Sequence, residues 1–93
     1  MSVKDKYQAG SEVPPTHMRQ MSNSELERYV RDRMVEELSA GAVRELWVDQ
    51  YPGERIVYVR VAEEQIPKAL DLAQSIRFTL DHQLPPVRIL IET

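Results

Sequence analysis

The stretch VRELWVDQYPGERIVYVRV, residues 43–61, decides the fold because it has the pattern of a β-hairpin. Two runs rich in β-branched and aromatic residues flank the sequence Tyr51-Pro52-Gly53-Glu54. Proline presets φ for the first central position of a type II turn, and glycine takes the positive φ that the second central position requires. The stretch therefore predicts two strands joined by a tight turn.

One register of this hairpin separates aliphatic from aromatic side chains. If Gln50 lies opposite Arg55, then Trp47 meets Tyr58, and a shift of one residue would mix the two faces. The aliphatic face, which we expect to be the core, comprises Leu46, Val48, Val57, Val59 and Val61. The second face is aromatic with charged margins and comprises Glu45, Trp47, Tyr51, Ile56, Tyr58 and Arg60.

The composition is that of one small globular domain. The chain has 93 residues, of which 42% are hydrophobic and 29% charged, and these values are ordinary for a soluble protein. It has no cysteine, no apolar run long enough to span a membrane, and no signal-peptide core at its N-terminus. We therefore expect a cytoplasmic protein without a membrane partner. The net charge of −3 does not predict broad attraction to nucleic acid.

The first part of the chain differs from the rest. Residues 1–21 show no sustained hydrophobic period and contain Gly10, Pro14 and Pro15. This composition is typical of an unanchored terminus. We therefore interpret residues 1–21 as a flexible N-terminal arm, which could also cover a surface of the domain, and residues 22–93 as a small α/β domain.

A helix is predicted to begin after Ser22. Ser22 can cap the helix while Glu25 returns a hydrogen bond, which is a capping box, and Ser24 with Glu27 is an alternative pair. Met21, which precedes Ser22, can pack against Leu26 as a hydrophobic staple. The buried stripe repeats at every fourth position: Leu26, Val30, Met34 and Leu38.

A second helix is predicted to follow the hairpin. Pro67 is tolerated in a first turn, so this helix begins near Gln65 or Ile66, and Pro85-Pro86 ends it. Its apolar face is expected to comprise Ile66, Ala69, Leu70, Ala73, Ile76, Leu80 and Leu84. The sequence VRILIE, residues 87–92, then alternates as a third strand.

The element order is therefore α-β-β-α-β. The connection through the second helix predicts that the third strand runs parallel to the second. We expect an α+β fold of two layers, a three-stranded mixed sheet with two helices on one face. No element remains to cover the aromatic face, except the arm or another molecule.

This order is similar to that of KH domains, of small ribosome-associated α/β folds and of the C-terminal domains of iron–sulfur scaffold proteins. The similarity covers residues 22–93 and is one of topology. The GxxG loop of the first group and the CxxC motif of the last are absent. The resemblance therefore implies a fold and not a function.

The sequence offers little for catalysis. Its two histidines, His17 and His82, lie far apart in the chain, and neither has a neighbour at metal-ligand spacing. The three glycines are isolated and form no phosphate-binding loop. We therefore expect a protein that is not an enzyme and that has no cofactor, metal site or catalytic residue.

Protein–protein contact is the leading interpretation, because tryptophan, tyrosine and arginine often anchor interfaces. We expect a non-catalytic interaction or assembly module, either an adaptor or a homodimer that self-associates through the aromatic face. The expected interface residues are Trp47, Tyr58, Arg60, Tyr51, Ile56, Phe78 and Leu90. The alternative is an RNA- or ribosome-associated KH-like factor without a GxxG loop, since aromatic side chains beside arginines can stack bases. The predicted domain has more acidic than basic residues, so binding to nucleic acid is the less favoured interpretation.

Overall fold

The structure is a computed structural model that describes residues 20–39 and 41–93. The predicted arm lies outside the described residues except for its last two, Gln20 and Met21. The elements are α1 (Asn23–Glu37), β1 (Val43–Tyr51), β2 (Glu54–Val61), the short 3-10 helix η2 (Glu63–Gln65), α2 (Ile66–Thr79) and β3 (Val87–Glu92).

The hairpin has the predicted register. The Cα partners include Gln50 with Arg55, Val48 with Val57, Leu46 with Val59, Trp47 with Tyr58 and Glu45 with Arg60. Gly53 has a φ of 88°, as the second central position of a type II turn requires. An irregularity between Val43 and Glu45 interrupts the pairing at the start of β1. β2 pairs with β3 in parallel, and the strand order is β1-β2-β3.

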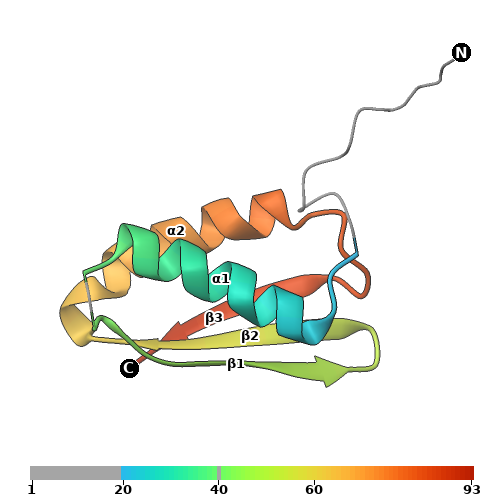
Figure 1. The fold of residues 1–93 in the computed structure, drawn as a ribbon, viewed down its shortest axis with the longest axis horizontal. Helices are drawn as coiled ribbons and strands as arrows, with labels where there is room; N and C mark the ends of the chain where they lie inside the picture. Colours follow the sequence, from blue (N-terminus) through green and yellow to red (C-terminus); the bar gives the residue numbers. More distant parts are fainter. Residues whose placement is uncertain (1–19, 40) are drawn as a thin grey trace, which may run out of the picture.

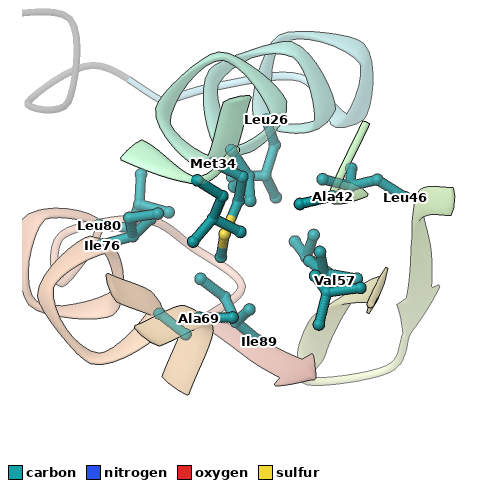
Figure 2. Close-up of a cluster of buried hydrophobic side chains, with 14 of the residues drawn as sticks. Leu26, Met34, Ala42, Leu46, Val57, Ala69, Ile76, Leu80 and Ile89 are labelled. Atoms are coloured by element: carbon teal, nitrogen blue, oxygen red, sulfur yellow. The ribbon is translucent and has the colours of Figure 1, made fainter. Parts of the chain in front are cut away.

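The described chain forms two layers, with both helices on one side of the sheet (Figure 1). α1 contacts β1, while α2 contacts β3 and α1. Side chains of both helices and all three strands converge between the layers, as Figure 2 shows for Met34, Ile76, Val57 and Ile89. The predicted α+β class with a three-stranded mixed sheet is confirmed.

The start of α1 follows the predicted capping box. The Ser22 hydroxyl accepts a hydrogen bond from the Glu25 backbone nitrogen at 3.1 Å, and the Glu25 carboxylate accepts one from the Ser22 nitrogen at 2.9 Å. Met21 and Leu26 both belong to the core, as a hydrophobic staple requires. All members of the predicted stripe are buried: Leu26, Val30, Met34 and Leu38.

The apolar face of α2 differs from the prediction at two positions. Leu70 is 52% exposed and Leu84 is 68% exposed, so neither belongs to the core. The helix ends at Thr79, which places Leu84 in the following loop. The buried side chains of α2 and its C-cap are Ala69, Ala73, Ile76 and Leu80, with Leu72 packed against them. The buried stripe is thus rotated away from Leu70 and toward Leu72.

A buried arginine joins three separate segments at one end of the sheet. Arg55 is only 3% exposed, because the alternation of β2 places it on the helix-covered face. Its Nη1 atom donates to the carbonyl oxygen of Met21 at 2.8 Å, and its Nε and Nη2 atoms each lie 3.4 Å from the carbonyl oxygen of Pro85. Arg55 thereby connects the N-terminus of α1, the strand β2 and the loop before β3.

The neighbours of this guanidinium complete a hydrogen-bonded cluster. Gln83, which is 1% exposed, accepts from the Met21 nitrogen at 2.8 Å and lies 3.5 Å from Nη2 of Arg55. The Arg55 nitrogen also donates to the carbonyl oxygen of Pro86 at 2.8 Å. Among the described residues, every acceptor of the guanidinium is a neutral oxygen. Burial lowers the pKa of Arg55 from its usual value.

None of the helices in the described segments is both long and apolar enough to cross a membrane.

Substitution of Val59 by aspartate should unfold the domain. Val59 is fully buried, so the carboxylate would have no partner, and we expect a loss of about 4 kcal/mol or more in the free energy of unfolding. The matched control is Val35→Asp, because Val35 lies on α1 and is 53% exposed, and it should cost about 1 kcal/mol or less, since an anion is only mildly unfavourable in the last turn of a helix. Urea denaturation measures both variants. Similar losses would contradict the assignment of the core face.

Substitution of Arg55 by glutamine should also destabilise the fold. The shorter side chain would leave buried carbonyl oxygens of two loops without their donor, at a loss of about 2 to 4 kcal/mol. Arg88→Gln removes an arginine that is exposed and paired with Glu54, and it should cost less than about 1 kcal/mol. Denaturant melts that give equal losses for the two variants would show that the buried cluster contributes little.

Candidate functional site

The open face, as we call the side of the sheet away from the helices, has no described element over it (Figure 1). Strand alternation and the two registers place three rows of side chains on it. These rows are Glu45–Arg60–Glu92, Trp47–Tyr58–Leu90 and Asp49–Ile56–Arg88, with Tyr51 and Glu54 beside the turn. An apolar row is thus flanked on both sides by rows that carry charge.

The central row consists of two stacked aromatic rings and a leucine. The rings of Trp47 and Tyr58 have centroids 5.0 Å apart and an interplanar angle of 18°. Both side chains are half-buried, and Leu90, the Cα partner of Tyr58, is 38% exposed. The stack holds the two rings in one orientation, so a partner would meet a preformed apolar surface.

Two tyrosine hydroxyls meet beside this row. The hydroxyl oxygens of Tyr51 and Tyr58 lie 3.4 Å apart, and Tyr51 is 41% exposed. The hydrogen bond to Tyr58, with smaller contributions that include the charge of Asp49, raises the pKa of Tyr51 to about 12. The Tyr51 hydroxyl therefore keeps its proton over the whole physiological pH range.

Ile56 has a structural position on the open face. It belongs to the row of Asp49 and Arg88, yet it is only 7% exposed. It lies outside the core cluster between the layers, so neighbouring side chains of the open face cover it. Ile56 therefore packs beneath the other side chains of the open face, and little of its surface is exposed to a partner.

Both arginines of the open face form ion pairs within the chain. Arg60 lies 3.0 Å from the Glu45 carboxylate. Arg88 lies 2.9 Å and 3.0 Å from the two carboxylate oxygens of Glu54. These pairs are exposed, so each contributes little to stability, but they hold the guanidinium groups against neighbouring carboxylates.

Six of the seven predicted interface residues gather on the open face, and Phe78 does not. Phe78 is 82% exposed and belongs to α2, in the layer that covers the opposite side of the sheet. One surface therefore cannot include Phe78 together with Trp47 and Tyr58. The prediction that both helices cover one face of the sheet already separates Phe78, which lies on the second helix, from the aromatic face.

Besides Glu45, four charged members of the open face were not among the predicted interface residues, although two of them share the face of Leu90 in the alternation of the third strand. Alternation along each strand was sufficient to find them, because each lies two positions from a residue that was predicted on this side of the sheet. They are Asp49, Glu54, Arg88 and Glu92. With Glu45 and Arg60, the open face carries four carboxylates and two guanidinium groups, a net charge of −2.

Other surfaces of the described chain offer less. Two hollows of about 340 and 510 Å³ follow the outer side of α1, where Arg31 lines both, and no histidine lines either. Within residues 20–39 and 41–93, no group of three or more His, Cys, Asp or Glu side chains could hold a metal ion. His17 lies outside the described residues, and His82 is exposed in the turn after α2. The open face is therefore the strongest candidate.

Comparison with protein-family models, with curated proteins and with solved structures gave no match.

The tyrosine pair predicts a late step in an alkaline titration. Absorbance of the wild type at alkaline pH should include one tyrosine that ionises near pH 12, and Tyr51→Phe should lose this step. Because folded Tyr51 holds its proton above its unfolded pKa of about 10, the free energy of unfolding should fall as pH rises from about 10 to about 12. Tyr29→Phe leaves the pair intact and should keep the step. A Tyr51→Phe titration that matches the wild type would contradict the contact.

Proposed function

We propose that this protein is a non-catalytic protein–protein interaction or assembly module that binds through the open face. One observation supports this proposal most directly: the apolar row, two stacked aromatic rings and a leucine, occupies the middle of a sheet face that no described element covers. Large apolar side chains on a preformed exposed surface favour contact with another molecule.

The arrangement has the features of an interface centre with a polar margin. Trp47, Tyr58 and Leu90 would supply the apolar contact, and Arg60 and Arg88 lie on opposite sides of them. In known interfaces, a few aromatic and arginine side chains provide most of the binding free energy, and polar neighbours exclude water from them. The proposal covers a homodimer and an adaptor that binds another protein, because both would use this face.

An RNA- or ribosome-associated factor is the second candidate. Stacked aromatic rings beside arginines favour it, since bases stack on such rings. The charge of the same face weighs against it, because both arginines are paired with carboxylates and the net charge is −2. For either candidate we propose the cytoplasm as the compartment, in line with the composition of the chain.

The double substitution Trp47→Ser, Tyr58→Ser should reduce association more than it reduces stability. The rings form a half-buried cross-strand pair, so we expect a loss of about 1 kcal/mol in the free energy of unfolding. A pair of core residues would lose about 3 to 5 kcal/mol for each side chain. Sedimentation over a range of concentrations and capture from nuclease-treated lysate measure association, while urea melts measure stability.

The matched control is Phe78→Ser, which removes an exposed aromatic side chain from the helix layer. This variant should associate like the wild type. A wild type that stays monomeric, and that captures the same proteins as the double variant, would contradict the proposal. Captured partners that disappear on nuclease treatment would favour the RNA-associated alternative.

A further inference from the structure

We propose that the open face binds a cationic segment of another protein, in which lysine or arginine side chains accompany apolar ones. This inference rests on the proposed function and specifies the chemistry of the partner. The apolar row selects for aliphatic or aromatic side chains, and the charges around that row select for positive ones.

The first argument is the charge that remains after internal pairing. Arg60 is paired with Glu45, and Arg88 is paired with Glu54. Within the described segments, Asp49 and Glu92 form no ion pair. In the described structure, two carboxylates of the open face therefore have no cationic partner, whereas both guanidinium groups are paired with carboxylates.

The second argument is the position of these carboxylates. Asp49 belongs to the row on one side of Trp47–Tyr58–Leu90, and Glu92 belongs to the row on the other side. Asp49 lies on β1 and Glu92 lies on β3, so they occupy diagonally opposite corners of the three rows. A segment laid across the apolar row could thus place one cation near each end.

The third argument is the stacked pair itself. The face of an indole or phenol ring attracts an ammonium or guanidinium group, and the attraction increases when the cation is partly removed from water. Trp47 and Tyr58 lie adjacent to Asp49 in the sheet. A cation placed here would gain from both the rings and the carboxylate.

Charge also weighs against the other occupants. Two copies of the chain would bring together two faces with a net charge of −2 each, and a nucleic acid would add phosphates to an acidic surface. Residues 1–19 carry three basic and two acidic side chains, so their excess of positive charge is small. A separate segment with several lysine or arginine residues matches the face better than any of these.

Selection from a displayed library of random short peptides tests the inference. The probe is the library itself, applied to the immobilised full chain. We expect the enriched sequences to combine lysine or arginine with aromatic or aliphatic residues, and to lose binding to the Trp47→Ser, Tyr58→Ser variant. Titration calorimetry then measures the affinity of one enriched peptide, synthesised alone, for each variant.

The double substitution Asp49→Asn, Glu92→Gln should lower the affinity for that peptide by about three- to tenfold and reduce the dependence of the affinity on sodium chloride concentration. The matched control is Glu63→Gln, Glu64→Gln, which removes two exposed carboxylates of η2 and should leave the affinity unchanged. Thermal melts verify that every variant is folded.

The outcomes separate the inference from the proposed function. Peptides that need Trp47 and Tyr58 but ignore Asp49 and Glu92 would overturn the cationic partner and leave the interaction module standing. Peptides that bind the Trp47→Ser, Tyr58→Ser variant as well as the wild type would count against the open face and so against both proposals. The inference would also be overturned if no peptide is enriched. A dimer formed through this face, or enrichment only after removal of residues 1–19, would overturn it by identifying another occupant of the open face.

Discussion

The buried guanidinium of Arg55 is the contact on which the packing of the layers depends at the turn end of the sheet. A charged group is stable there only because its fixed, planar set of donors meets carbonyl and amide oxygens from several directions. Those oxygens belong to Met21, before α1, and to Gln83 and Pro85 of the loop before β3, and both segments are far from Arg55 in the sequence. The Arg55 side chain therefore helps to position the chain around residue 21 and the loop before β3 relative to β2, together with the hydrogen bond of Gln83 to Met21 and that of the Arg55 nitrogen to Pro86.

The second constraint is the size of the chain. Two helices can cover one face of a three-stranded sheet, and here they cover the face that presents Val57, Val59 and Ile89. The opposite face has no second layer over it. Its side chains interact with one another instead, through cross-strand ion pairs, an aromatic stack and a tyrosine pair. The same side chains form a surface that another molecule can contact.

Much of this arrangement could be predicted because it depends on local rules. The turn residues and the period of two determined the hairpin register, and Ser22 with Glu25 determined where α1 begins. The same alternation places Arg55 on the helix-covered face, so its burial could be predicted. Its hydrogen-bond acceptors could not, because they belong to segments that no sequence pattern brings together. The exposure of Leu70 depends on how α2 rotates against the sheet, which neighbouring helices and strands decide, whereas the separation of Phe78 from Trp47 and Tyr58 follows from the layer to which α2 belongs.

The position of Trp47 has a practical consequence. It is the only tryptophan in the chain, and it lies half-buried in the middle of the open face. Indole fluorescence responds to the polarity around the ring, so the emission of the unlabelled protein reports on a single place. Because that ring is stacked on Tyr58 and not enclosed in the core, a molecule that binds the open face would shift the emission maximum while the fold stays the same. The intrinsic fluorescence of the protein thus reports directly whether the open face is bound.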